Sequence, residues 1–249
     1  MGLLENKVTV VTGAAAGIGR GVADLFAREG AVVYLLDVDG AGAEAAAAAI
    51  CKGGSTAHAF AADVSRRETI EPAINDALER YGRIDAVVNN AGIYPRRTFE
   101  EMTEAEWDET QNVNVKGMFH MTKLVLPHMR ARRSGKIVNI SSVTFFKGFA
   151  RLTHYVASKG AVLGFTRALA REIGPDQVCV NAVTPGAIET EGEKIHANPD
   201  DIAKIMEQQC LQRRILPIDV ARVCLFLASE LSDGMTGQTV NVDGGLIMY

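Results

Sequence analysis

The sequence predicts an α/β protein with a doubly wound, seven-stranded parallel sheet and helices on both of its faces. Short apolar runs alternate with longer amphipathic stretches along all 249 residues, which is the pattern of repeated strand–helix units. The apolar runs are nearly continuous, as in residues 32–36, and such runs are typical of strands buried on both faces. No linker rich in proline or glycine and no internal repeat divides the chain. We therefore expect a single domain over residues 1–249.

Seven segments rich in valine, isoleucine and other apolar residues are the expected strands, and segments with helical spacing of apolar residues separate them. The strands are predicted at residues 7–13, 31–37, 56–63, 84–92, 136–142, 178–186 and 238–245. The helices are predicted at residues 17–30, 41–52, 65–80, 155–172 and 218–229, with a further long helix that begins at Thr103. Gly30 is a suitable C-cap for the first helix, and Thr103 with Glu106 has the spacing of a capping box.

The least regular part of the chain lies between the sixth strand and the last helix. It is polar and rich in glutamate. A long connection inside a compact domain is usually a binding loop or a lid. We therefore expect a substrate lid at about residues 187–214.

The composition excludes several classes of partner. A formal charge of -4 and a sequence pI of about 5.8 predict that no nucleic acid is bound. No apolar run approaches the roughly 18 residues that span a bilayer, and the N-terminus lacks a secretory leader pattern, so we expect a cytoplasmic protein with no membrane partner. The four cysteines show neither CxxC nor histidine spacing, so no metal site is expected.

A glycine-rich loop joins the first strand to the first helix and reads TGAAAGIG at residues 12–19. Gly13 permits a tight turn, Gly17 lets the backbone approach a pyrophosphate, and Gly19 lets the helix pack against the strand. The helix N-terminus then offers N–H groups and a partial positive charge to the phosphates. Three glycines also occur in ordinary turns, but the strand before them and the helix after them favour dinucleotide binding. No GK[ST] follows, which excludes a Walker-type loop.

An acidic residue, Asp37, ends the second strand. At this place a carboxylate accepts hydrogen bonds from the adenosine ribose diol and repels a 2′-phosphate. Ala16 is neutral and no arginine directly follows Asp37, so the sequence predicts NAD rather than NADP as the cofactor. The alternative role for an aspartate here, capping the next helix, suits Asp39 better.

Six short motifs occur in order along the chain. They are TGAAAGIG at 12–19, NNAG at 89–92, VNV at 113–115, SS at 141–142, YVASK at 155–159 and TPG at 184–186. This set resembles the short-chain dehydrogenase/reductase superfamily in its common single-domain form, from residue 7 to residue 245. The resemblance implies a Rossmann fold, an NAD(P)-dependent oxidoreductase that acts on CH–OH groups, and a homotetramer.

The resemblance also implies which residues are functional. The family's catalytic tetrad corresponds to Asn114, Ser142, Tyr155 and Lys159, and Ser142 is preferred to Ser141 because it lies thirteen residues before Tyr155. Besides Tyr155 and Lys159, the expected cofactor contacts are Gly13, Gly17, Ile18, Gly19, Asp37, Asp63, Val64, Asn90, Ala91, Gly92, Pro185, Gly186, Ile188 and Thr190. Phe145 departs from the family, because many members carry glycine three residues after the serine.

The tyrosine and the lysine are four residues apart, so they share one face of a helix. A free phenol has a pKa of about 10, and we expect the Lys159 ammonium and a positive nicotinamide ring to lower it, so that Tyr155 acts as the general acid/base. Ser142 is expected to hold the substrate oxygen, and in the family Asn114 supports a water that links the lysine to solvent. Each residue alone could be structural, but together, behind a dinucleotide loop, they favour catalysis.

Aromatic residues follow the fourth and fifth strands, at Tyr94, Phe145, Phe146 and Phe149. They either line the substrate site or pack in the core or in a subunit contact. The SVTFF and NAVTPGAIETEGE stretches are similar to family members acting on aryl and ring alcohols. We therefore expect a small-molecule substrate, a secondary or ring-bearing alcohol or ketone. His154 could touch substrate or simply pack, and the sequence assigns it no role.

Two other functions stay open on the sequence. A 3-oxoacyl-[acyl-carrier-protein] reductase would use NADPH, which Asp37 disfavours, and would need a basic surface for its carrier, which Arg96 and Arg97 could supply. A non-catalytic NAD-binding sensor on the same fold is the second alternative. Such proteins commonly lose the tyrosine or the lysine, and this chain has both.

Overall fold

The computed structural model describes residues 2–196 and 199–248, and its strands form a seven-stranded sheet. The strand order is β3-β2-β1-β4-β5-β6-β7, and every neighbouring pair is parallel. The strands are β1 (Val8–Thr12), β2 (Val32–Asp37), β3 (Thr56–Ala61), β4 (Ala86–Asn89), β5 (Gly135–Ile140), β6 (Val178–Pro185) and β7 (Thr239–Val242). The order reverses between β1 and β4, which is where a doubly wound sheet binds its ligand, beyond the carboxyl ends of the strands. The predicted fold class is confirmed.

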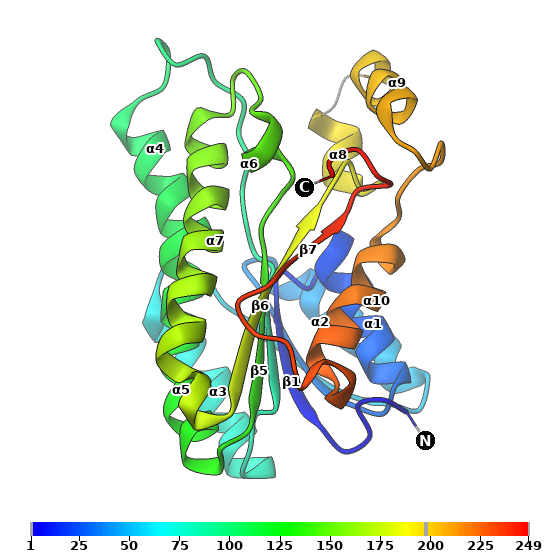
Figure 1. The fold of residues 1–249 in the computed structure, drawn as a ribbon. Helices are drawn as coiled ribbons and strands as arrows, with labels where there is room; N and C mark the ends of the chain where they lie inside the picture. The colour runs from blue at the N-terminus through cyan, green and yellow to red at the C-terminus, as the bar shows by residue number, and fades with distance from the viewer. Residues whose placement is uncertain (1, 197–198, 249) are drawn as a thin grey trace.

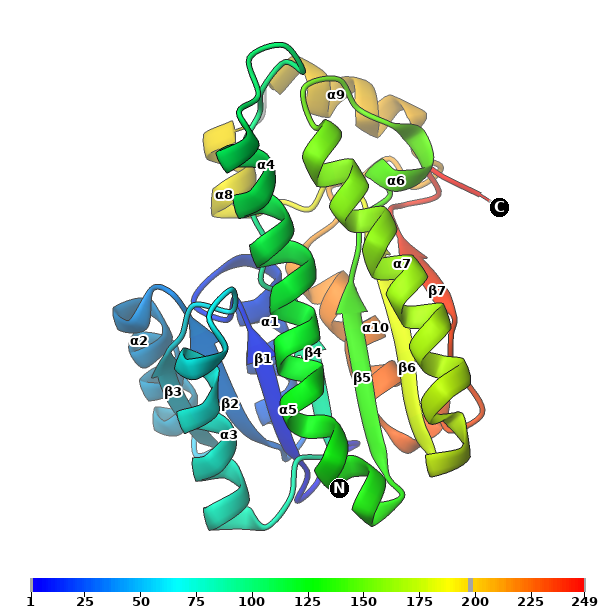
Figure 2. The ribbon, with the colours of Figure 1, turned by 90° about the vertical axis from the view of Figure 1, so that its left-hand side faces the viewer.

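Helices cover both faces of the sheet, with α3, α4, α5 and α7 on one side and α1, α2 and α10 on the other (Figure 1). The helices are α1 (Gly17–Arg28), α2 (Gly40–Lys52), α3 (Arg67–Tyr81), α4 (Glu104–Gln111), α5 (Gly117–Arg132), α6 (Thr144–Lys147), α7 (Thr153–Ile173), α8 (Glu191–His196), α9 (Pro199–Gln208) and α10 (Pro217–Ala228). Each face buries its own apolar cluster. Phe26 of α1 belongs to one cluster, and Ile74 of α3 and Met121 of α5 belong to the other. Figure 2 shows α5 and α7 lying along the strands of their face.

The long helix expected from Thr103 is interrupted. α4 begins with the predicted capping box of Thr103 and Glu106 and runs to Gln111. A single π-helical turn, Asn112–Lys116, then connects it to α5. Such turns insert one residue into a helix and occur often at functional sites. Here the turn buries Asn114 beneath the carboxyl ends of the strands.

The polar segment at residues 187–214 contains two short helices, α8 and α9, which lie beyond the carboxyl ends of β6 and β7 (Figure 1). Residues 197 and 198 of this segment lie outside the described residues. Among the helices that the structure describes, none combines the length and the apolar character that crossing a membrane requires. Within the same residues, no group of three or more histidine, cysteine or acidic side chains is arranged to hold a metal ion.

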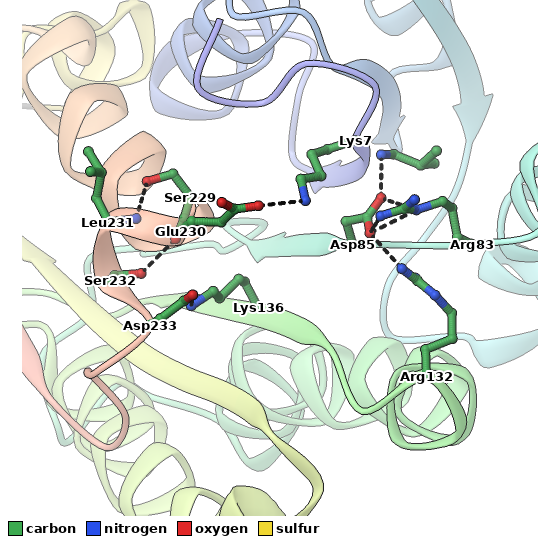
Figure 3. A network of polar contacts seen from close by, with 11 residues as sticks. Lys7, Arg83, Asp85, Arg132, Lys136, Ser229, Glu230, Leu231, Ser232 and Asp233 are labelled. Carbon is green, nitrogen blue, oxygen red and sulfur yellow. Dashed lines mark hydrogen bonds and ion pairs between the residues drawn. The ribbon is translucent and has the colours of Figure 1, made fainter.

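The amino-terminal edge of the sheet is held by ion pairs (Figure 3). Asp85, just before β4, accepts hydrogen bonds from Arg132 at 3.0 Å and from the Val8 backbone at 2.8 Å, and it is paired with Arg83. The Asp85 side chain is only 9% exposed. The contacts join α5 and β1 to the start of β4, at the edge opposite the glycine-rich loop.

Candidate active site

The glycine-rich loop connects β1 to α1 in a tight turn. Gly13 and Gly17 have φ of 63° and 58°, in the left-handed region that favours glycine. A Cβ on Gly19 would lie 2.0 Å from the Gly13 carbonyl oxygen, so a side chain there would separate the helix from the turn. The Asn90 amide donates to the carbonyl oxygens of Thr12 at 2.9 Å and Gly13 at 3.0 Å. The NNAG segment therefore fixes the shape of the loop.

The N-terminus of α1 is left open to an anion. Its N-cap, Ala16, provides no side-chain hydrogen bond, and the first turn contains no acidic residue. The N-termini of α2 and α4, by contrast, are capped by Asp39 and by Thr103. Uncapped N–H groups and the positive end of the helix dipole suit a pyrophosphate. The residues present therefore fit the pyrophosphate of a dinucleotide.

Asp37 ends β2 beside this loop. Its carboxylate accepts hydrogen bonds from the backbone N–H groups of Ala15 at 2.9 Å and Asp39 at 3.0 Å. The Asp39 side chain caps α2 through the Gly42 N–H at 3.0 Å, as its sequence position suggested. Asp37 is therefore left facing the glycine-rich loop, where the ribose of a dinucleotide bound to that loop would lie.

The remaining predicted contacts near the adenine side are ordered by local hydrogen bonds. Asp63 accepts from the Ser65 N–H at 2.9 Å and hydroxyl at 2.7 Å, and the neighbouring Val64 is buried. The Thr12 hydroxyl accepts from the backbone N–H groups of Asn90 at 3.0 Å and Ala91 at 3.1 Å. Ile18 of α1 packs against the apolar cluster below the loop.

The segment after β6 approaches the same loop. The Gly186 N–H donates to Val242 at 3.0 Å, directly after Pro185 ends the strand. Ile188 is buried and forms an isolated parallel bridge with Ile215. The Thr190 methyl lies 3.4 Å from the position a Cβ on Gly17 would take. The structure thus brings Thr190 over the glycine-rich loop.

The four residues of the predicted tetrad meet at the carboxyl ends of β4 and β5. The Lys159 nitrogen lies 5.5 Å from the centroid of the Tyr155 ring, one turn earlier on α7. It donates to the Ile140 carbonyl oxygen at 2.9 Å. The Ser142 side chain lies near enough to Tyr155 to lower the pKa of its phenol. A Cβ on Gly92 would lie 3.2 Å from the Asn114 oxygen and 3.4 Å from the Lys159 nitrogen, so glycine there leaves room for both groups.

The pKa values correct one expectation. Desolvation raises the pKa of the Tyr155 phenol to about 12, although the hydrogen bond from Ser142 acts in the opposite direction. Burial lowers the pKa of Lys159 to about 8. Desolvation is therefore the largest effect on the phenol, and Lys159 is not among the groups that shift its pKa. In the presence of a bound cofactor, the Lys159 ammonium and a positive nicotinamide ring are the groups that would stabilise the phenolate.

Ser158 is a site residue that the sequence reasoning missed. The Asn114 amide donates to its hydroxyl at 2.9 Å, and that hydroxyl donates to the Tyr155 carbonyl oxygen at 2.7 Å. The serine is fully buried and ties the π-helical turn to α7. The available signal was its place inside YVASK, one residue before the lysine.

Phe145, Tyr94 and His154 lie near the site in different surroundings. Phe145 lies across α7, where a Cβ on Gly160 would meet its ring at 2.8 Å, and its side chain is 44% exposed. Tyr94 stands beside Tyr155, with ring centroids 5.8 Å apart. His154 is fully buried, and neither ring nitrogen has a hydrogen-bond partner among the described residues. Burial lowers the pKa of this imidazole.

The fold and these motifs define a short-chain dehydrogenase/reductase. A sequence profile of the family described as "Enoyl-(Acyl carrier protein) reductase" matches residues 13–247. The chain therefore belongs to the short-chain dehydrogenase/reductase superfamily, whose members are oxidoreductases acting on CH–OH or carbonyl groups with NAD(P).

Individual relatives extend over nearly the whole chain. A probable galactose dehydrogenase of Rhizobium meliloti is 36% identical over 98% of this chain and 96% of its own length. A 3-oxoacyl-[acyl-carrier-protein] reductase of Thermotoga maritima is 39% identical over 98% of this chain and 99% of its own. The solved structure of a candidate gluconate dehydrogenase from Agrobacterium tumefaciens superposes with a TM-score of 0.93 at 30% identity, covering 98% of this chain and 96% of that one.

Proposed function

We propose that this protein transfers a hydride between NAD and a secondary or ring-bearing alcohol or ketone, with Tyr155 as the general acid/base. The observation that carries the proposal is the surroundings of Tyr155, which has the Lys159 nitrogen 5.5 Å from its ring and the Ser142 side chain near enough to lower the pKa of its phenol. This group lies beside a glycine-rich loop and an uncapped helix N-terminus. The relative named as a galactose dehydrogenase supports a ring-bearing alcohol.

Each protein group has a defined task in the proposed oxidation. The Ser142 hydroxyl orients the substrate oxygen, and the Tyr155 oxygen takes the alcohol proton. Lys159 stabilises the phenolate that precedes this transfer. When bound, NAD provides the nicotinamide carbon that accepts the hydride leaving the alcohol carbon. The products are the ketone, NADH and a Tyr155 that has gained the alcohol proton, so protons and electrons balance, and the reverse steps reduce a ketone with NADH.

The cofactor and the lid belong to the same proposal. Asp37 faces the loop with a negative charge, which favours an unphosphorylated ribose and hence NAD over NADP. We assign the segment at residues 187–214 as the substrate lid, because its Thr190 lies against Gly17. We propose that the predicted cofactor contacts from Gly13 to Thr190 line one dinucleotide site.

The Tyr155→Phe variant tests the proposal. Removal of one hydroxyl should lower kcat at least about 100-fold while NAD binding, followed by fluorescence or calorimetry, is retained. A variant that keeps wild-type turnover would refute the acid/base role. A wild-type protein that binds NAD but turns over no alcohol, ketone or acyl thioester would instead be a non-catalytic sensor.

The second candidate function is reduction of 3-oxoacyl carrier-protein substrates with NADPH. The 39% identity to the Thermotoga maritima reductase favours it. Rates with NAD and NADP, measured side by side on ring alcohols and on an acetoacetyl thioester, separate the two. Activity restricted to the thioester with NADPH would replace the first proposal by the second.

We also propose a cytoplasmic homotetramer. Trp107 of α4 and Phe119 of α5 are 36% and 48% exposed, and a neighbouring subunit would cover them. Analytical ultracentrifugation should give the mass of four chains. A Phe119→Ser variant should shift the equilibrium toward smaller species.

A further inference from the structure

Tyr94 lies beside Tyr155, the proposed general acid/base. It lies in the loop after β4, and its ring is tilted by 59° to the Tyr155 ring at a centroid distance of 5.8 Å. The two phenols are close enough that Tyr94 contributes to raising the pKa of Tyr155. A ring attached to the reacting carbon would therefore meet the Tyr94 side chain.

The backbone around Tyr94 is fixed on both sides. Asn114 accepts a hydrogen bond from the Ile93 N–H at 2.8 Å and donates to the Ile93 carbonyl oxygen at 2.9 Å. Further along, the Arg97 N–H donates to the Arg151 carbonyl oxygen at 3.0 Å. A side chain on such a constrained segment can discriminate between substrates, because a misfit is not relieved by loop movement.

The hydroxyl group of Tyr94 lies close to Gly192 of the proposed lid. A Cβ on Gly192 would lie 3.2 Å from the Tyr94 hydroxyl oxygen. The next residue, Glu193, donates its backbone N–H to the Thr190 hydroxyl at 3.1 Å, and Thr190 in turn lies over Gly17. The lid therefore contacts the glycine-rich loop and Tyr94 through neighbouring residues.

The charges at this contact are paired. Glu193 forms an ion pair with Arg214, which also lies 3.8 Å from Glu189. Burial raises the pKa of Tyr94, and the Glu193 carboxylate adds to this shift, so Tyr94 is a neutral phenol at physiological pH. The wall of the site is thus polar, and the Glu193 charge is balanced by Arg214.

We propose that Tyr94 is a specificity-determining residue that selects an uncharged, ring-bearing alcohol carrying a second hydroxyl group. The Tyr94 ring packs on the substrate ring, and the Tyr94 hydroxyl forms a hydrogen bond with the second hydroxyl. A phenol hydroxyl can accept hydrogen bonds as well as donate one. It can therefore bind the second substrate hydroxyl while it keeps a hydrogen bond to the protein. This inference rests on the proposed ring-alcohol dehydrogenase function.

The test compares Tyr94→Phe with the wild type on cyclohexanol and trans-cyclohexane-1,2-diol, with NAD. The variant keeps the ring and loses only the hydroxyl. We expect kcat/KM for the diol to fall about tenfold, the loss of one hydrogen bond, while kcat/KM for cyclohexanol stays within about twofold. Tyr81→Phe, which removes a hydroxyl on α3 bonded to His58, is the matched control and should leave both values unchanged.

A second variant tests the contact with the lid. Gly192→Ala places a methyl group against the Tyr94 hydroxyl, so KM for the diol should rise with little change in kcat. Gly164→Ala is its control, because no atom lies within 4 Å of the added Cβ.

The outcomes separate this inference from the proposed function. A wild-type enzyme that oxidises both alcohols, with equal losses or no loss in Tyr94→Phe, would overturn the role of Tyr94 alone. A wild-type protein that oxidises neither alcohol would overturn the proposed ring-alcohol activity, and the assignment of Tyr94 with it.

Discussion

Asn114 satisfies both polar backbone groups of Ile93, accepting from its N–H at 2.8 Å and donating to its carbonyl oxygen at 2.9 Å. The buried Asn114 side chain thus forms the two hydrogen bonds with the Ile93 backbone that a neighbouring β-strand would form. The π-helical turn is what points Asn114 at this loop, because it shifts the register of the helix by one residue. The predicted tetrad asparagine is therefore also an anchor for the loop that carries Tyr94.

The Asn114→Ala variant should lose kcat because the loop and Ser158 lose their shared partner. We expect a fall of about 10- to 100-fold, the size of effect that a small misplacement of site groups produces. Asn114→Asp keeps an acceptor for the Ile93 N–H and removes the donor. Its kcat should therefore lie between that of Asn114→Ala and that of the wild type. Steady-state kinetics on both variants checks this order, and an alanine variant with unchanged kcat would contradict it.

Oxidation and reduction should depend on pH in different ways. Oxidation needs Tyr155 as a proton acceptor, and its pKa is raised to about 12, so the deprotonated fraction grows with pH throughout the neutral range. Reduction needs the phenol, which is already protonated there. Values of kcat/KM for oxidation should therefore rise up to about pH 8, above which Lys159 loses the charge that stabilises the phenolate, while those for reduction stay level or fall. Profiles measured in both directions on one substrate pair check this, and an oxidation rate that falls between about pH 6 and pH 8 would contradict it.

Replacing Asp37 should change the choice of cofactor. Asp37→Ser removes the charge that opposes a 2′-phosphate, so the ratio of kcat/KM for NADP to that for NAD should rise about tenfold or more. Asp39→Ser is the matched control, since that aspartate is two residues away and caps α2 through Gly42. The control should leave the cofactor ratio unchanged. An equal shift in both variants would mean that general charge, and not the position of Asp37, sets the preference.

Asp85 should contribute strongly to folding stability (Figure 3). Burial alone would raise its pKa, but hydrogen bonds from Arg83, Val8 and Arg132 lower the pKa below its usual value. This stabilisation is present above the unfolded-state pKa and is lost as pH falls through the lower folded-state value. Asp85→Asn should reduce the free energy of unfolding in urea by about 3 kcal/mol, because two arginines lose their partner.

The control for Asp85 is the ion pair of Lys7 with Glu230, whose acidic side chain is 78% exposed. Glu230→Gln should change the free energy of unfolding by less than about 1 kcal/mol. Comparable losses of unfolding free energy in the two variants would show that burial of the charge does not explain the contribution of Asp85 to stability.

Much of this molecule could be predicted because its signals are local. Strand–helix alternation and the capping box of Thr103 depend on neighbouring residues, and the fold class and this cap follow the prediction. The positions of Tyr155 and Lys159 on one helical face also follow from spacing alone.

Features that depend on three-dimensional packing were not predictable in the same way. The π-helical turn at Asn112–Lys116 is too short to change the spacing of apolar residues in the sequence in a recognisable way. The raised pKa of Tyr155 results from desolvation by surrounding elements, which no spacing reveals. The contact between the Phe145 ring and Gly160 likewise joins residues fifteen positions apart, so local patterns do not reveal it.

The contact between Phe145 and Gly160 couples the segment after β5 to α7. A Cβ at position 160 would lie 2.8 Å from the Phe145 ring, so Gly160→Ala would force that ring to shift. A change made on the helix would therefore be transmitted to the neighbouring segment, and the two positions can be redesigned only together.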